Sequence, residues 1–156
     1  MKSTLFNRFV FAATLAVSSA AMGQTNDSKE LAVMGRIAWS AFECSSLAAQ
    51  MKDTKEQERL FMLGYDQGKR FIEAAQGGKI DRQDIRGEVP IGLTMLLQGP
   101  TPDFMLGRVY ESTQDAALKD VLRTNGNLNS DDVQALLARN KYTEQNCRLL
   151  RANSEA

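Results

Sequence analysis

The chain has 156 residues, with 19 Lys and Arg against 19 Asp and Glu, two cysteines and no histidine. The absence of histidine excludes the Ser-His-Asp triad, the Cys-His pair and His-ligated zinc. The net charge of zero also argues against a nucleic-acid-binding protein, because phosphate binding needs an excess of lysine and arginine on one face.

The first 23 residues have the features of a secretory signal peptide. Lys2 and Arg8 form a basic segment, and residues 9–21 are uncharged and mostly apolar. Small residues up to Gly23 suit signal cleavage, so Gln24 is the expected mature start. A retained membrane anchor would need about 20 apolar residues, more than this run contains. We therefore expect a periplasmic or secreted protein without a membrane anchor.

Removal of this segment takes away two basic side chains and no acidic one, so the mature chain, residues 24–156, has a net charge of −2. It keeps Cys44 and Cys147, which have one intramolecular pairing in an oxidising compartment. Neither cysteine lies in the Cys-x-x-Cys motif that would favour a redox-active pair. We expect one structural disulfide, joining the first mature helix to the C-terminal tail.

Two long helices are predicted at the start of the mature chain. Asp27 is the expected N-cap of the first helix, in a carboxylate version of the capping box, and apolar residues follow it at helical spacing. Asp53 begins the second helix by the same pattern, and Gly77 and Gly78 end it.

Glycines inside the predicted helices indicate close packing. Gly64 and Gly68 lie four residues apart, and therefore on one face of the second helix. Each costs a helix interior about 0.8–1 kcal/mol relative to alanine. We expect another helix to approach closely here, with Gly107 of a later helix as a third packing position. A ligand or partner groove is the alternative.

The middle of the chain contains two short predicted elements. Residues 81–86 predict a helical turn that Gly87 closes. Residues 89–97 are the most apolar stretch of the mature chain, and Pro90 suits a first helical position. We expect a short buried helix, a strand being the weaker alternative because of Pro90 and Gly92.

Two further helices complete the predicted fold. Thr101 and Pro102 provide a hydroxyl cap and a proline at the first helical position. The turn at Gly126 ends this helix, and Ser130 opens a last helix that ends near Asn140, before a C-terminal tail. We expect one all-α domain, a compact bundle of five or six helices with one disulfide.

Without histidine, catalysis would depend largely on carboxylates or on a metal with oxygen ligands. Glycoside cleavage needs two carboxyl groups on either side of the reacting bond. Residues 125–132 offer oxygen ligands but lack the glutamate of an EF-hand. We therefore expect no metal or cofactor and no catalytic residue. The spacing singles out no pair among the candidate acids, which are Glu43, Asp66, Glu73, Glu88, Asp103 and Glu111.

The helix that follows Pro102 carries a candidate recognition face. Phe104, Arg108, Tyr110 and Glu111 include the aromatic and arginine types that dominate interface hot spots. Arg108 and Glu111 can pair at i,i+3. The alternative is simple packing of this helix against the two glycines of the second helix. We expect the partner to be another protein, a homodimer being one form of this.

The order of several motifs resembles a known family. Cys44 in the first mature helix is followed by GYDQG at residues 64–68, by VPIGLT at residues 89–94 and by a helix begun at Pro102. This layout is similar to that of the small periplasmic immunity proteins against type VI-secreted amidases. The resemblance implies a helical, disulfide-bonded, exported protein that neutralises a toxin by binding it.

The sequence therefore favours an exported protein-binding domain that performs no catalysis, such as an inhibitor or immunity protein. Two alternatives stay open. One is a carboxylate-based hydrolase of envelope polymers, and the other is a structural or stress-related envelope protein.

Overall fold

The computed structural model describes residues 20–151, with side chains described from residue 27. The predicted signal peptide therefore lies mostly outside the described residues. The fold is all-α, as the sequence predicts, and the described part of the chain contains six α-helices. In chain order the elements are α1 (Ala20–Gln50), α2 (Thr54–Gln76), α3 (Arg82–Glu88), α4 (Ile91–Met95), α5 (Pro102–Leu122), β1 (Arg123–Thr124), β2 (Asn127–Leu128), α6 (Asp131–Glu144) and the 3-10 turn η1 (Cys147–Leu149).

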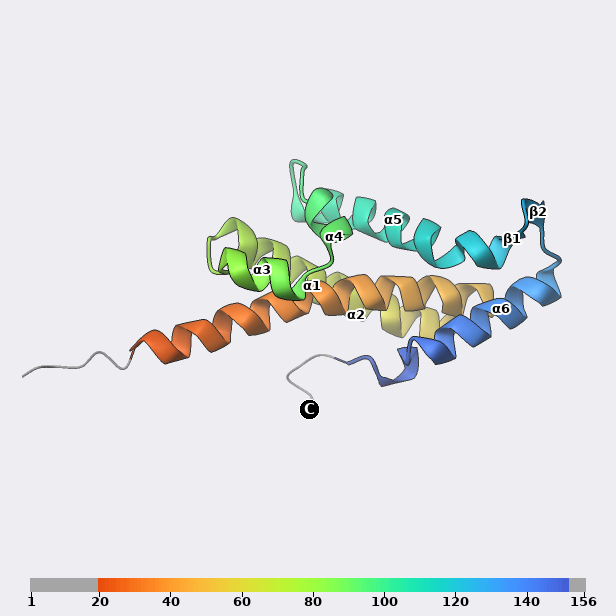
Figure 1. Cartoon of the computed structure of the whole chain (residues 1–156), viewed down its shortest axis with the longest axis horizontal. Coiled ribbons are helices and arrows are strands. Elements are labelled where there is room, and N and C mark those ends of the chain that lie inside the picture. The colour runs from red at the N-terminus through yellow and green to blue at the C-terminus, as the bar shows by residue number, and fades with distance from the viewer. Residues whose placement is uncertain (1–19, 152–156) are drawn as a thin grey trace, which may run out of the picture.

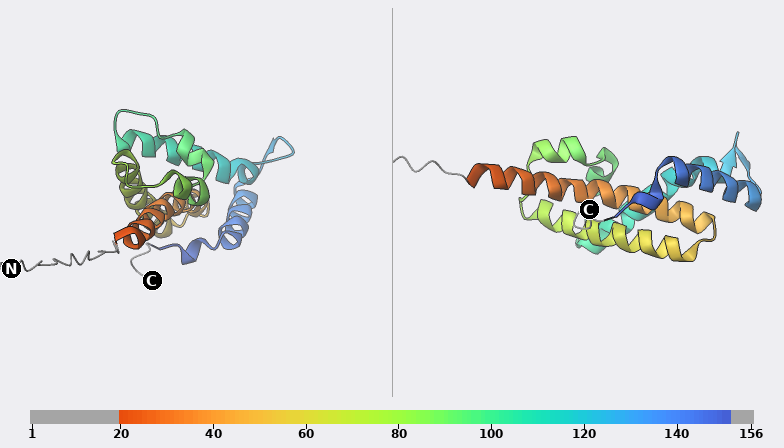
Figure 2. Two further views of the ribbon diagram at one scale, coloured as in Figure 1. Left: turned by 60° about the vertical axis from the view of Figure 1, so that its left-hand side comes forward. Right: turned by 90° about the horizontal axis from the view of Figure 1, so that it is seen from below.

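Helix α1 is the centre of the bundle. It packs along α2, which runs back beside it, and it also contacts α3, α5, α6 and η1. Figure 1 shows α4 and α5 on one side of α1 and the C-terminal turn on the other. The second view of Figure 2 shows α1 and α2 side by side over most of the length of α2.

Two apolar clusters form the core along α1. The first, at the end where α3 and α4 pack, includes Phe42, Phe71, Leu93 and Val109. The second, at the end where α6 returns, surrounds the cysteines and includes Leu47, Leu60, Val121, Ala138 and Cys147. The side chains of Phe42, Leu47 and Leu60 are almost completely buried, and burial of each such side chain stabilises the fold by about 1.5–3 kcal/mol.

The predicted caps of α2 and α5 are confirmed. The Asp53 carboxylate accepts a hydrogen bond of 3.2 Å from the backbone N–H of Glu56. The Thr101 hydroxyl oxygen likewise accepts from the backbone N–H of Phe104 at 3.1 Å. Gly77 is the C-cap of α2, as its position predicts. These bonds satisfy N–H groups that have no partner within the helix.

The predicted N-cap of α1 at Asp27 is wrong, because α1 begins at Ala20 and Asp27 lies inside it. The next residue, Ser28, has the larger structural role. Its side chain is 2% exposed, and its hydroxyl donates to Asp84 at 2.5 Å and accepts from the backbone N–H of Asp81 at 2.9 Å. These bonds attach α1 to the start of α3.

The predicted buried helix over residues 89–97 is also wrong in extent and in burial. Helix α4 has only five residues, and among them only Leu93 is buried. A helix this short can direct only one side toward the core, so Ile91 and Met95 point away from it and are 78% and 69% exposed. Gly87 lies within α3 rather than ending it.

The region between α5 and α6 differs from the prediction as well. Asn125 and Gly126 have positive φ angles of 51° and 82° and connect β1 to β2 as a tight antiparallel hairpin. Positive φ at both central residues is typical of the Asn-Gly hairpin turn. Helix α6 continues past Asn140 to Glu144 and therefore includes Tyr142.

Among the helices of the described chain, none has the length and apolarity needed to cross a membrane.

Candidate functional site

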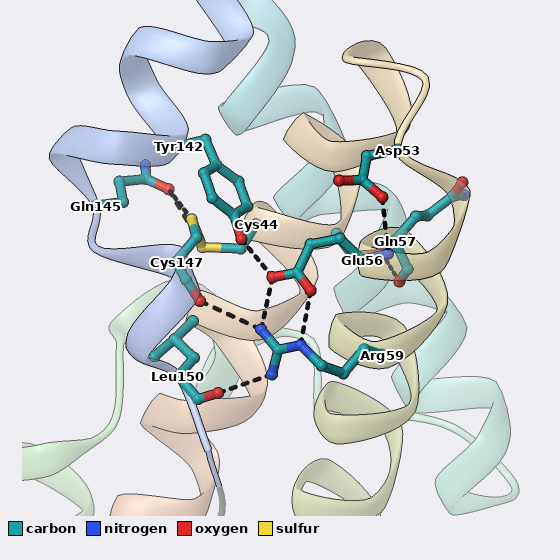
Figure 3. A network of polar contacts seen from close by, with 10 residues as sticks. Cys44, Asp53, Glu56, Gln57, Arg59, Tyr142, Gln145, Cys147 and Leu150 are labelled. Atoms are coloured by element: carbon teal, nitrogen blue, oxygen red, sulfur yellow. Dashed lines mark hydrogen bonds and ion pairs between the residues drawn. A yellow bond between two sulfur atoms is a disulfide. The ribbon is translucent and has the colours of Figure 1, made fainter.

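The disulfide predicted from the cysteine count is present. The Cα atoms of Cys44 and Cys147 are 5.6 Å apart and their sulfurs are bonded, across a sequence separation of 103 residues. Both side chains are almost fully buried in the second core cluster. The bond joins α1 to η1, so the C-terminal turn is fixed against the centre of the bundle (Figure 3).

A polar network reinforces this attachment, and it was not predicted from the sequence. Glu56 accepts two hydrogen bonds from the Arg59 guanidinium, at 2.8 Å to Nε and 2.7 Å to Nη2. Tyr142 of α6 donates its hydroxyl proton to the same carboxylate. Arg59 also donates to the carbonyl oxygens of Cys147 and Leu150, at 3.5 and 2.9 Å. Figure 3 shows these bonds linking α2, α6 and the tail.

The network changes the acidity of its members. The hydrogen bonds from Arg59 lower the pKa of Glu56 to about 2, and the bond from Tyr142 also lowers it. Burial and the bond to Glu56 raise the pKa of Tyr142 to about 12. Glu56 is therefore ionised and Tyr142 neutral at pH 7. Only the i,i+3 spacing of Glu56 and Arg59 was available in the sequence as a signal, because Tyr142 lies 86 residues away from Glu56.

Next to this network lies an open groove of about 1070 Å³. One wall is the loop that leads into α2, and the other is the end of α6 with η1. The groove includes the exposed cations Lys52, Lys55, Arg139 and Arg148 in its lining. Among the described residues, none of these four forms an ion pair.

The predicted recognition residues do not all share one face. Phe104 is 51% exposed, and Glu111 is exposed on the same side of α5. Arg108 lies between them but donates to the carbonyl oxygens of Gln98 and Leu96, at 2.7 and 3.4 Å. It therefore attaches the end of α4 to α5, and the predicted pair with Glu111 is absent from the ion pairs of the described residues.

Tyr110 lies apart from the other three recognition residues. Its ring is half-buried and makes edge contacts with the rings of Phe42 and Phe61, at centroid distances of 5.3 and 5.2 Å. The aromatic ring thus fills the junction of α1, α2 and α5. Its position is that of a packing residue.

Two of the three glycines that were predicted to pack closely against another helix do so. A Cβ atom at Gly64 would lie 2.6 Å from the Phe42 ring, and one at Gly68 would lie 2.5 Å from Leu106. The prediction for Gly107 is wrong, because a Cβ there would meet no atom within 4 Å and the residue is exposed. Helix α5 directs Leu106, rather than Gly107, toward α2.

Two apolar residues of α4, Ile91 and Met95, are also exposed. Ile91 and Met95 lie one turn apart on one side of α4. On its other side, Gly92 packs against Trp39, where an added Cβ would lie 2.6 Å from the indole. We call Ile91, Met95, Phe104 and Glu111 together the α4–α5 face. The apolar run at 89–97 was visible in the sequence, but its exposure was not.

The candidate carboxylates do not share partners. Glu43 accepts from the Trp39 indole at 3.0 Å, and burial raises its pKa. Glu88 pairs with Lys29 and Arg36. Asp103 accepts from Tyr65 at 2.8 Å, whereas Asp66, Glu73 and Glu111 are exposed. No two of these acids share a hydrogen-bond or ion-pair partner among residues 27–151. Within the same residues, no group of three or more cysteine, aspartate or glutamate side chains could hold a metal ion.

None of the family models, curated proteins or solved structures compared with this chain matches it significantly.

Proposed function

We propose that this chain is an exported protein-binding domain without catalytic activity, and that it contacts its partner through the α4–α5 face. The inhibitor or immunity role implied by the motif order is the form of this proposal that we favour. Export follows from the features of residues 1–23 and is part of the proposal.

The exposure of Ile91, Met95 and Phe104 carries the proposal. Large apolar side chains exposed together on one region are typical of protein interaction sites. Here they are also held in place: Gly92 packs on Trp39, and Arg108 bonds the end of α4 to α5. A rigid face loses less conformational entropy on binding, which favours affinity.

The charges beside these residues indicate the chemistry of the partner. Glu111 and Asp115 lie seven and eleven residues after Phe104 and are both exposed, so they continue the same side of α5. Neither forms an ion pair with another described residue. The face therefore fits a protein surface with an apolar depression and basic residues at its rim.

The separate partners of the candidate carboxylates support binding over hydrolysis. A glycosidase needs its two carboxyl groups within about 5–9.5 Å of each other around one bond. Glu43 and Glu88 instead have separate partners, Trp39 for the first and Lys29 with Arg36 for the second. Glu43 has the raised pKa that a general acid requires, but its carboxylate is engaged by Trp39.

Site-specific photo-cross-linking in the cells of origin tests the proposal. A photoreactive phenylalanine analogue is placed at Phe104, or at Leu136 of α6, which is 59% exposed and serves as the matched control. We expect one discrete protein adduct in the exported fraction from position 104 and none from position 136. Equal adducts at both positions, or none at 104, would count against the proposal.

A further inference from the structure

The groove between the start of α2 and the end of α6 has a charge unlike that of the whole chain. Four of its lining side chains are basic, Lys52, Lys55, Arg139 and Arg148, whereas the chain as a whole has no net charge. Two of its lining residues, Asp53 and Glu56, are acidic. We propose that this groove binds an acidic segment of a partner protein, and that it is a second site, separate from the α4–α5 face.

The two acidic residues of the groove are already engaged. The Asp53 carboxylate caps α2, and Glu56 accepts from both Arg59 and Tyr142. The four cations, by contrast, are exposed and form no ion pair with any residue from 27 to 151. Four cations against two acids leave the lining with a net positive charge, and Arg59 further offsets the charge of Glu56. The field that an incoming ligand meets is therefore basic, which attracts and orients acidic side chains.

The walls of the groove are rigid, because both are fixed to the bundle. The disulfide attaches Cys147 to α1, and the Arg59 guanidinium bonds the carbonyl oxygens of Cys147 and Leu150. Tyr142 joins the end of α6 to the first turn of α2. The backbone positions that carry the cations on opposite walls thus keep their spacing when the groove is empty, so a ligand loses less conformational entropy on binding.

The apolar part of the lining favours a peptide over a nucleic acid. Met51 and Leu149 line the groove, and Leu149 is 64% exposed, so an acidic segment with one or two apolar anchors would have contacts for both. Single-stranded nucleic acid is held by exposed aromatic rings on which bases stack. The aromatic residue of this lining, Tyr142, is only 8% exposed and its hydroxyl is bonded.

Fluorescence anisotropy with the purified, oxidised mature protein tests this site. The probes are a labelled 12-residue peptide of aspartate and glutamate with two leucines, the same peptide with glutamine for each acid, and a labelled 12-nucleotide single strand. We expect saturable binding of the acidic peptide only. Near 1 M salt, where the Debye length falls to about 3 Å, this binding should be largely lost.

A double variant that removes two positive charges from the groove tests whether the peptide binds there. The variant Arg139→Gln/Arg148→Gln should weaken the acidic peptide about tenfold. The control Arg70→Gln/Lys119→Gln removes the same charge from exposed positions outside the groove and should change affinity by less than about twofold. All four positions are exposed, so circular dichroism and thermal unfolding should match the parent protein.

Three results would overturn the assignment of this groove. The acidic peptide does not bind, the two double variants weaken its binding equally, or the nucleotide strand binds more tightly than the acidic peptide. Self-association of the protein that the Arg139→Gln/Arg148→Gln variant abolishes would assign the groove to a second copy instead. Phe104→Ala should leave peptide binding unchanged, so failure here is distinct from failure of the α4–α5 face.

Discussion

Tyr142 donates its hydroxyl proton to the carboxylate of Glu56, and this bond joins the last turn of α6 to the first turn of α2. The same carboxylate holds Arg59, which in turn bonds the carbonyl oxygens of the C-terminal turn. Helix α2 and the C-terminal region formed by α6 and η1, which are far apart in the sequence, therefore meet at one ionised group beside the disulfide. Changes to these residues should therefore alter the free energy of unfolding.

Removal of the hydroxyl group should loosen the end of α6. In Tyr142→Phe, the ring still packs in the second core cluster, but Glu56 loses one donor. A hydrogen bond to a charged group contributes about 1.5–3 kcal/mol, so we expect the free energy of unfolding to fall by about 1–2 kcal/mol. Urea denaturation of the oxidised protein measures this. An unchanged midpoint would show that the bond contributes nothing net.

The same two residues should make stability depend on pH at both extremes. The folded pKa of Glu56 is about 2 and lies below its ordinary 4.5, so its contribution is present above pH 4.5 and is lost as the pH falls toward 2. The folded pKa of Tyr142 is about 12, above its ordinary 10, so its contribution is lost as the pH rises from 10 toward 12. Thermal unfolding across pH should show a steeper alkaline loss in the parent protein than in Tyr142→Phe. Parallel alkaline curves would contradict the role of Tyr142.

The glycines of α2 and α5 should respond oppositely to the same substitution. Gly68→Ala places a methyl group 2.5 Å from the buried Leu106 side chain, and such overpacking costs about 1–3 kcal/mol, against a gain of up to about 1 kcal/mol from the better helix propensity of alanine. Gly107→Ala meets no atom within 4 Å and should stabilise the helix by about 0.5–1 kcal/mol. Denaturation midpoints should therefore move in opposite directions. Movement in the same direction would mean that the packing of α2 against α5 is misassigned.

The features that the sequence predicted well depend on neighbouring residues. The caps at Asp53 and Thr101 and the C-cap at Gly77 each follow from a few adjacent positions. The disulfide followed from counting, because two cysteines have one pairing. Gly64 and Gly68 were predicted to pack closely from their spacing alone, and this holds.

The features that the sequence did not predict depend on tertiary contacts. The exposure of Ile91 and Met95 is set by which side of a five-residue helix meets Trp39, and apolarity alone suggested burial. Gly107 resembled the other helix glycines until the rotation of α5 placed Leu106 inward. The groove and its network join residues far apart in the sequence, such as Glu56 and Tyr142, which are 86 positions apart, so no local pattern contains them.

Neutralising Glu43 should stabilise the protein at pH 7. Burial raises the pKa of this carboxyl more than the hydrogen bond from Trp39 and the charge of Lys141 lower it. A raised acid pKa means that stability falls as the pH rises and the buried group ionises. In Glu43→Gln, the amide oxygen can still accept from the indole without a buried charge. We expect a higher urea midpoint at pH 7 and a smaller difference at pH 4. A lower midpoint at pH 7 would show that the attraction to Lys141 dominates.

The central claim is that the protein functions by binding through the α4–α5 face. Its most direct test is the affinity of the partner identified by cross-linking at Phe104, measured by calorimetry for Met95→Ala, Phe104→Ala and the control Leu136→Ala. Truncation of a buried interface anchor costs about 2 kcal/mol or more, so we expect binding to weaken at least about tenfold in the first two variants. The control, exposed on α6, should remain within about twofold. Equal affinities for all three variants and the parent protein would contradict the claim.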